Sequence, residues 1–87
     1  MSWKVRISRR AQEDLDQLRA YDSDLYTKAY LMVRSIENDP YEGIGSPGRL
    51  SLIGPNVWFR RLSLVHRIVY EVSEELVVIV SFRLHIE

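Results

Sequence analysis

Residues 57–80 read VWFRRLSLVHRIVYEVSEELVVIV, and this stretch decides the fold. It contains two runs of β-type residues, 57–62 and 66–72, and a Ser-Glu-Glu turn at 73–75 that leads into a third run, 76–85. Aromatic and β-branched residues in short runs bounded by turn residues are typical of strands. The stretch therefore predicts three consecutive strands of a mainly antiparallel sheet.

The third run begins with five apolar residues, which predicts a central strand covered on both faces. Alternation along a strand sorts its residues by face. One set is expected to form the helix-covered core: Leu76, Val78, Val80, Phe82 and Leu84. The other set is expected to face away from the helices: Val77, Ile79, Ser81, Arg83 and His85.

The first half of the chain predicts one strand and two helices. Trp3, Val5 and Ile7 alternate with polar residues as in a half-buried strand. Ser8 is a suitable cap for a helix over 9–20, whose apolar residues recur at spacings of four and three. A second apolar stripe predicts a helix over 24–37, which ends at the Asn-Asp-Pro of 38–40.

A glycine-rich loop at 38–48 follows, then a short strand at 49–53 and a Gly-Pro-Asn turn. The order β-α-α-β-β-β-β predicts an α+β fold, with two N-terminal helices packed on one face of a mainly antiparallel sheet. With 87 residues and no linker, one domain is expected over 1–87.

Composition narrows the possible classes. The chain has no cysteine, no apolar run long enough for a membrane span and no apolar leader, so we expect a cytoplasmic protein that does not bind a membrane. Its 12 basic residues balance its 12 acidic ones, but residues 43–70 contain four arginines and no acid. Such a block is able to face an anion locally although the molecule is neutral.

Strand parity places Arg61 and Arg67 on faces that meet if their strands are neighbours, and His85 then joins them. Arginines with an imidazole are the groups that metal-free phosphodiester cleavage requires, because guanidinium stabilises phosphate charge and imidazole moves protons near neutral pH. The alternative is that Arg83 pairs with Glu71 or Glu87 and that His85 has no role. No metal, cofactor, phosphate-binding loop or serine-nucleophile motif is predicted.

Several motifs in the second half occur in a known order and spacing. They are Asp-Pro-Tyr-Glu-Gly-Ile-Gly at 39–45, Trp-Phe-Arg-Arg-Leu at 58–62, His-Arg-Ile-Val-Tyr at 66–70 and Phe-Arg-Leu-His at 82–85. With them, the chain resembles the YoeB/Txe branch of the RelE-like toxins of bacterial type II toxin-antitoxin modules. The resemblance implies a RelE-like microbial RNase fold and ribosome-dependent cleavage of mRNA by attack of the ribose 2′-hydroxyl on the adjacent phosphate.

The same resemblance implies roles for individual residues. Arg67 matches the family's phosphate-stabilising arginine, Arg61 a second basic contact and His85 the catalytic histidine. RNA or ribosome contacts are expected from Arg49, Arg60, His66 and Arg83. Two positions depart from the family pattern: Gly48 stands where the family has a glutamate that acts as general base, and Ile86 where it has a tyrosine. Glu42, in the same loop as Gly48, is a weaker candidate for the base.

The resemblance also implies partners. The first is a cognate antitoxin of the YefM/Phd-like kind, which is expected to cover the basic block 43–70. The others are the 70S ribosome with its mRNA, and operator DNA, which is reached only through the antitoxin. A homodimer is a further option. Two alternatives stay open. One is a toxin-fold protein that has lost cleavage and acts by binding its antitoxin or as part of a DNA-bound complex, and the other is a ParE-like gyrase inhibitor.

Overall fold

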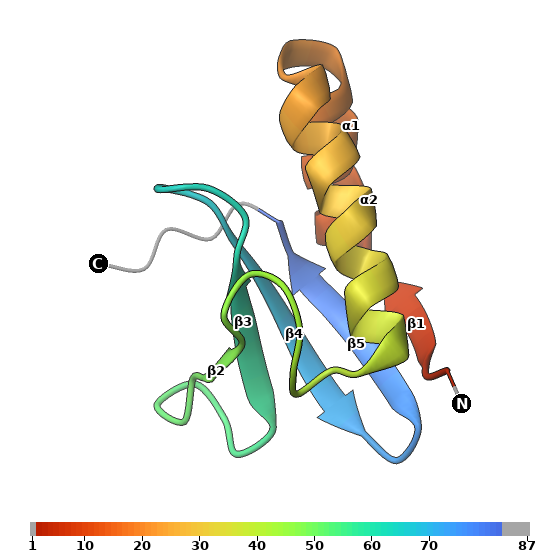
Figure 1. Ribbon diagram of the computed structural model, residues 1–87, viewed down its shortest axis with the longest axis vertical. Helices are drawn as coiled ribbons and strands as arrows, with labels where there is room; N and C mark the ends of the chain where they lie inside the picture. Colours follow the sequence, from red (N-terminus) through yellow and green to blue (C-terminus); the bar gives the residue numbers. More distant parts are fainter. Residues whose placement is uncertain (1, 83–87) are drawn as a thin grey trace.

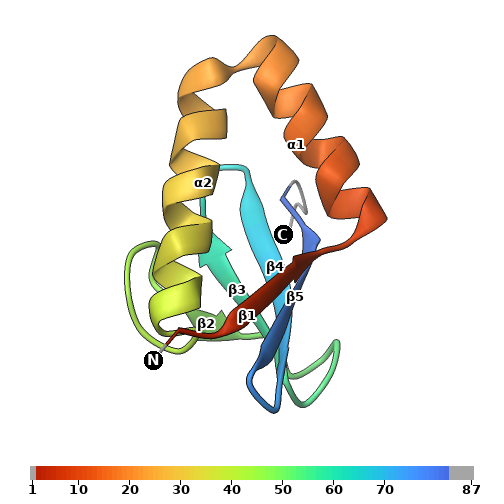
Figure 2. The same ribbon diagram turned by 90° about the vertical axis from the view of Figure 1, so that its right-hand side faces the viewer.

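Two capped helices form a hairpin beside the sheet (Figure 2). In the computed structural model, which describes residues 2–82, strand β1 spans Lys4–Ile7, helix α1 spans Arg9–Tyr21 and helix α2 spans Ser23–Asn38. The Ser8 side chain accepts a hydrogen bond from the Ala11 N–H at 3.1 Å, and Asp22 accepts one from the Leu25 N–H at 3.1 Å. Both caps satisfy N–H groups that a first helical turn leaves without partners.

The helices bury the apolar stripes that their spacing predicts. Most of the stripe residues are buried: Ala11, Leu15 and Leu18 on α1, and Ala29, Met32, Val33 and Ile36 on α2. Leu25, at the start of the α2 stripe, is partly buried. The buried stripe residues form one cluster with inward-facing residues of the sheet, among them Ile68, Tyr70 and Ile79. Over residues 2–82, neither helix has the length and apolar content needed to cross a membrane.

The sheet has five strands in the order β1-β5-β4-β3-β2 (Figure 1). Strand β2 spans Gly48–Arg49, β3 spans Val57–Arg61, β4 spans Arg67–Ser73 and β5 spans Leu76–Ser81. Strands β2 to β5 are antiparallel to their neighbours, whereas β1 pairs in parallel with β5. The α+β prediction and the sequential order of β3, β4 and β5 are confirmed.

The faces of β5 differ from the prediction. Val77 and Ile79 are fully buried beneath the helices, whereas Val80 is 39% exposed. A run that is apolar at every position does not indicate which set faces the helices. In addition, the register shifts at a bulge, where Tyr70 pairs with Ile79 and the preceding residue of β4 pairs with Ser81. An extra residue reverses the alternation beyond it, so Phe82 is buried in the core as predicted.

The segment after the glycine-rich loop is also different from the prediction. The expected strand at 49–53 is only two residues long, because the chain turns back at Leu50, whose carbonyl accepts from the N–H groups of Ile53 and Gly54 at 2.9 and 3.2 Å. Leu52 and Ile53 are consequently exposed at this turn.

Candidate active site

Arg61 and Arg67 lie directly opposite each other on neighbouring strands. They form the last pair of the β3–β4 register, next to a pair of Arg60 with Ile68. Ile68 belongs to the core beneath the helices, so the alternation of the strand turns Arg67 and its partner to the other face. Arg61 is exposed and Arg67 is half-buried. The two arginines therefore meet as the parity argument requires, while His85, the expected third member, lies outside the described residues.

The electrostatics of this pair favour an anion. Like charges directly opposite on a sheet are destabilising. Within the part of the chain that the structure describes, no carboxylate forms an ion pair with Arg61 or Arg67. Among residues 2–82, the Arg67 guanidinium interacts with the Phe59 ring, whose centre lies 5.9 Å from Cζ. The fork of N–H donors on a guanidinium matches the geometry of a phosphate group.

The Phe59 ring also covers the backbone of Gly48. Gly48 pairs with Phe59 across β2 and β3, and a Cβ atom at Gly48 would lie 2.7 Å from Cε1 of the ring. Contacts this short require the ring to move, so a carboxylate at position 48 does not fit beside Phe59 as it stands. The Phe59 ring thus occupies the space that a side chain at position 48 would need.

Arg60 does not fit the RNA-contacting role that the sequence predicts. It is fully buried, and each of its five N–H groups has an acceptor inside the protein. Nε donates to Tyr70 Oη at 3.1 Å, and Nη1 donates to Ser35 Oγ at 2.6 Å and to a loop carbonyl. The alternation that exposes Arg61 points its neighbour inward, beneath α2. Arg60 and Arg61 thus carry the same charge and are adjacent in the sequence, but one is buried and the other is exposed.

Backbone carbonyls rather than a carboxylate surround the Arg60 guanidinium. The carbonyls of Asp39, Glu42 and Ile44 accept its remaining hydrogen bonds, and the first of these lies at the C-terminal end of α2, where the helix dipole favours a cation. The guanidinium therefore fastens the glycine-rich loop to the sheet. Gly43, with φ +137°, approaches so closely that a Cβ there would lie 2.8 Å from Nη1 of Arg60.

Tyr70 completes this anchor. Its hydroxyl accepts from Arg60 and donates to the Pro40 carbonyl at 2.6 Å. Burial raises the pKa of the Tyr70 hydroxyl above its ordinary value of 10.0, and the hydrogen bond from Arg60 lowers it in part. Tyr70 is therefore a neutral hydrogen-bonding group at physiological pH.

Arg49 lies on the opposite face of the sheet from Arg61 and Arg67. It pairs with Trp58, which packs against the helix-covered core, and its guanidinium carbon lies 5.8 Å from the centre of the Trp58 ring. Its Nη2 donates to the Pro55 carbonyl. The structure therefore does not bring Arg49 together with the arginine pair, although the side chain is exposed.

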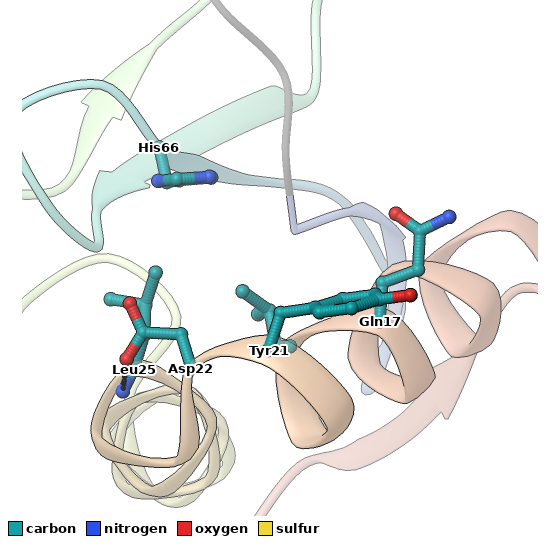
Figure 3. Close-up of a pocket in the computed structure, with 6 residues that line it drawn as sticks. Gln17, Tyr21, Asp22, Leu25 and His66 are labelled. Carbon is teal, nitrogen blue, oxygen red and sulfur yellow. Dashed lines mark hydrogen bonds between the residues drawn. The ribbon is translucent and has the colours of Figure 1, made fainter.

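His66 begins the approach to β4 and lines a cleft of about 190 Å³ between the β3–β4 connection and the turn of the helix hairpin. Figure 3 shows it across the cleft from Tyr21 and Asp22. Its Nδ1 lies 3.0 Å from Ser63 Oγ, which also accepts from the His66 N–H at 3.0 Å. His66 precedes Arg67 in the chain, so it is beside the arginine pair rather than within it.

The two remaining predicted site residues, Arg83 and His85, lie outside the described residues. Conversely, parity reasoning places Phe59 on the same face as Arg61 but does not predict the contacts of its ring with Arg67 and Gly48. It also missed Asp14 on α1, whose carboxylate is hydrogen-bonded to the end of β5. No spacing in the sequence signals a contact between positions so far apart.

Comparisons with known proteins agree with this architecture. A family model described as a YoeB-like toxin of bacterial type II toxin-antitoxin system matches residues 7–86. A Toxin YoeB of Synechocystis sp. is 29% identical over 82 residues, which cover 94% of this chain and 95% of that protein.

Two solved structures are similar throughout. The YoeB dimer from Staphylococcus aureus has a TM-score of 0.88 at 28% identity and covers 99% of this chain and 100% of that chain. The heterotetrameric YoeB-YefM toxin-antitoxin complex from the same species has a TM-score of 0.82 at 28% identity, with the same coverage of both chains. The family match over nearly the whole chain, together with the shared fold, shows that this protein belongs to the YoeB-like toxins of bacterial type II toxin-antitoxin systems.

Proposed function

We propose that this toxin cleaves mRNA on the ribosome at the face that carries Arg61 and Arg67, without a metal ion. The observation that supports it is the opposed arginine pair, because two cations on neighbouring strands with no carboxylate partner among residues 2–82 are stabilised when an anion binds to both. A scissile phosphate is such an anion, and its charge increases in the transition state. Fixed donors are most useful at that point.

In the proposed reaction the ribose 2′-oxygen attacks the adjacent phosphorus while the 2′-hydroxyl loses its proton. The bond from phosphorus to the 5′-oxygen of the next nucleotide breaks, and that oxygen takes up a proton. The products are a 2′,3′-cyclic phosphate and a free 5′-hydroxyl. Arg67 and Arg61 stabilise the phosphate oxygens, and His85 is the predicted proton-transfer group.

The family membership and the YefM-bound relative support a cognate antitoxin of the same kind as the partner of this toxin. It is proposed to cover the basic block 43–70, which includes both arginines of the pair. Neutralisation then follows from loss of access to the phosphate-binding face.

A second candidate function rests on one observation, the glycine at position 48, whose backbone lies against the Phe59 ring. Because Gly48 has no side chain that could act as a base, a site that relied on a base at this position would be inactive. Loss of a positioned base costs about 10² to 10⁴ in rate. The protein would then act by binding its antitoxin, without cutting RNA.

The test uses purified toxin, 70S ribosomes and a defined mRNA, with the 5′ ends of the products mapped. We expect cuts within translated codons and products with 5′-hydroxyl ends. Arg67→Ala should lower the cleavage rate by about 10² to 10³, as expected when one charge-stabilising donor is removed. Arg34→Ala, which removes an exposed arginine of α2, is the matched control and should cleave at the wild-type rate.

Growth after induced expression distinguishes the two candidates. Arrest with new 5′ ends in translated messages supports the nuclease. Normal growth with intact messages, in cells that contain folded toxin, would refute the nuclease proposal and leave the binding function.

A further inference from the structure

The end of β5 is held by helix α1 through Asp14. A single oxygen of the Asp14 carboxylate, Oδ2, accepts hydrogen bonds from Ser81 Oγ and from the Phe82 N–H, both at 3.1 Å. The donors are almost completely buried, Ser81 at 1% and Phe82 at 0% exposed. These bonds connect residues 67 and 68 positions apart, so they are specific tertiary contacts.

The sheet does not provide this restraint at the same point. The β4–β5 register is interrupted by the bulge, and its last pair joins Val69 to Ser81. Strand β5 ends at Ser81, so the Phe82 N–H finds its acceptor on α1 and not on a neighbouring strand. A bulge bends and twists the strand that carries it, which makes the direction of the chain beyond it dependent on other contacts.

Ser8, the cap at the beginning of α1, holds the two residues of β5 that precede Ser81. Ser8, the cap of α1, donates from its Oγ to the Val80 carbonyl at 3.1 Å, and its N–H donates to the Ile79 carbonyl at 3.0 Å. The first turns of α1 thus bond to four successive residues of the chain, from Ile79 to Phe82. Asp14 contributes the two bonds nearest the exit.

We infer that Asp14 is a positioning residue, whose carboxylate fixes the point at which the chain leaves β5. Its catalytic consequence rests on the proposed function. His85 is three residues beyond Phe82, and three residues span at most about 10 Å. The place and direction of Phe82 therefore limit where the predicted catalytic imidazole is able to reach relative to Arg67.

The variants Asp14→Ala and Asp14→Asn test this inference, with Asp16→Ala as the control. Asparagine keeps an oxygen acceptor of similar size, and alanine removes it. Asp16 is an exposed carboxylate on the same helix, and among residues 2–82 it accepts from Gln12. Each variant is first shown to be folded by circular dichroism at the assay temperature. The rate of mRNA cleavage on programmed 70S ribosomes is then measured over a range of ribosome concentrations.

We expect Asp14→Ala to lower the rate at saturating ribosomes by about 10-fold to 10², because small displacements of a reacting group have effects of this size. The ribosome concentration at half-saturation should stay the same, since the arginine pair is intact. Asp14→Asn should recover most of the rate, and Asp16→Ala should match the wild type. A folded Asp14→Ala variant with the wild-type rate, or one that Asp14→Asn does not rescue, would overturn the inference.

Hydrogen exchange separates this inference from the proposed function. The Phe82 amide should exchange slowly in the wild type and in Asp16→Ala, and much faster in Asp14→Ala. If the wild type cuts no RNA while this pattern holds, the proposed nuclease fails and the positioning contact stands. Equal Phe82 exchange in Asp14→Ala and the wild type would refute the contact whatever the activity.

Discussion

Replacing Arg60 with lysine should destabilise the toxin far more than the same replacement at Arg61. Arg60 is fully buried and donates five hydrogen bonds, whereas Arg61 is exposed. A lysine ammonium has only three N–H donors, so at least two of the acceptors around it lose their partner. Leaving one buried acceptor unsatisfied costs about 1–3 kcal/mol, so two such acceptors give about 2–6 kcal/mol for Arg60→Lys.

This cost is large for so small a protein, because a chain of this length is stabilised by about 4–13 kcal/mol in total. Urea unfolding followed by circular dichroism measures it. With a slope of about 1–2 kcal/mol per molar urea, the midpoint of Arg60→Lys should fall by about 1–6 M. The free energy of unfolding of Arg61→Lys should differ from that of the wild type by no more than about 0.5 kcal/mol. Equal midpoints for the two variants would refute the role of Arg60 as the anchor of the loop.

Two further predictions follow from contacts of the same sheet. The folded state raises the pKa of Tyr70 above 10.0, so the contribution of the neutral hydroxyl to stability is fully present below pH 10 and is lost as pH rises through the higher folded value. Urea midpoints should therefore fall above pH 10 more steeply in the wild type than in Tyr70→Phe. Parallel pH profiles of the two proteins would contradict this. Gly48→Ala should cost about 1–3 kcal/mol by pressing on the Phe59 ring, and a double-mutant cycle with Phe59→Leu should recover part of that cost, whereas purely additive effects would show that the ring is not the obstacle.

The sequence predicts most of the fold because its signals are local. The stripes that include Leu15 and Met32 place both helices within a residue or two of their observed bounds. Short turns make β3, β4 and β5 sequential neighbours, which is the condition for Arg61 to meet Arg67. The opposed arginines are the part of the candidate site that alternation and strand order together predict.

Long-range contacts account for what the sequence does not predict. Nothing in Trp-Phe-Arg-Arg distinguishes the buried Arg60 from the exposed Arg61 until the side of the sheet that the helices cover is known. The run from Leu76 to Val80 is apolar at every position, so its faces are decided by packing and by a bulge rather than by pattern. Asp14 reads as an ordinary helix carboxylate because its partners come 67 and 68 positions later.

The parallel pairing of β1 with β5 affects the order of events during synthesis. The contacts that close the domain join positions up to 72 apart, and long-range contacts are the slowest to form because loop closure comes before they stabilise the chain. Helices α1 and α2 leave the ribosome long before β5, so Leu15 and Leu18 have no complete sheet to cover until β5 follows. A nascent chain that stops before β5 therefore has no closed core to hold the arginine pair in place. Any activity that depends on the arginine pair therefore requires that β5, the last described strand, has been made.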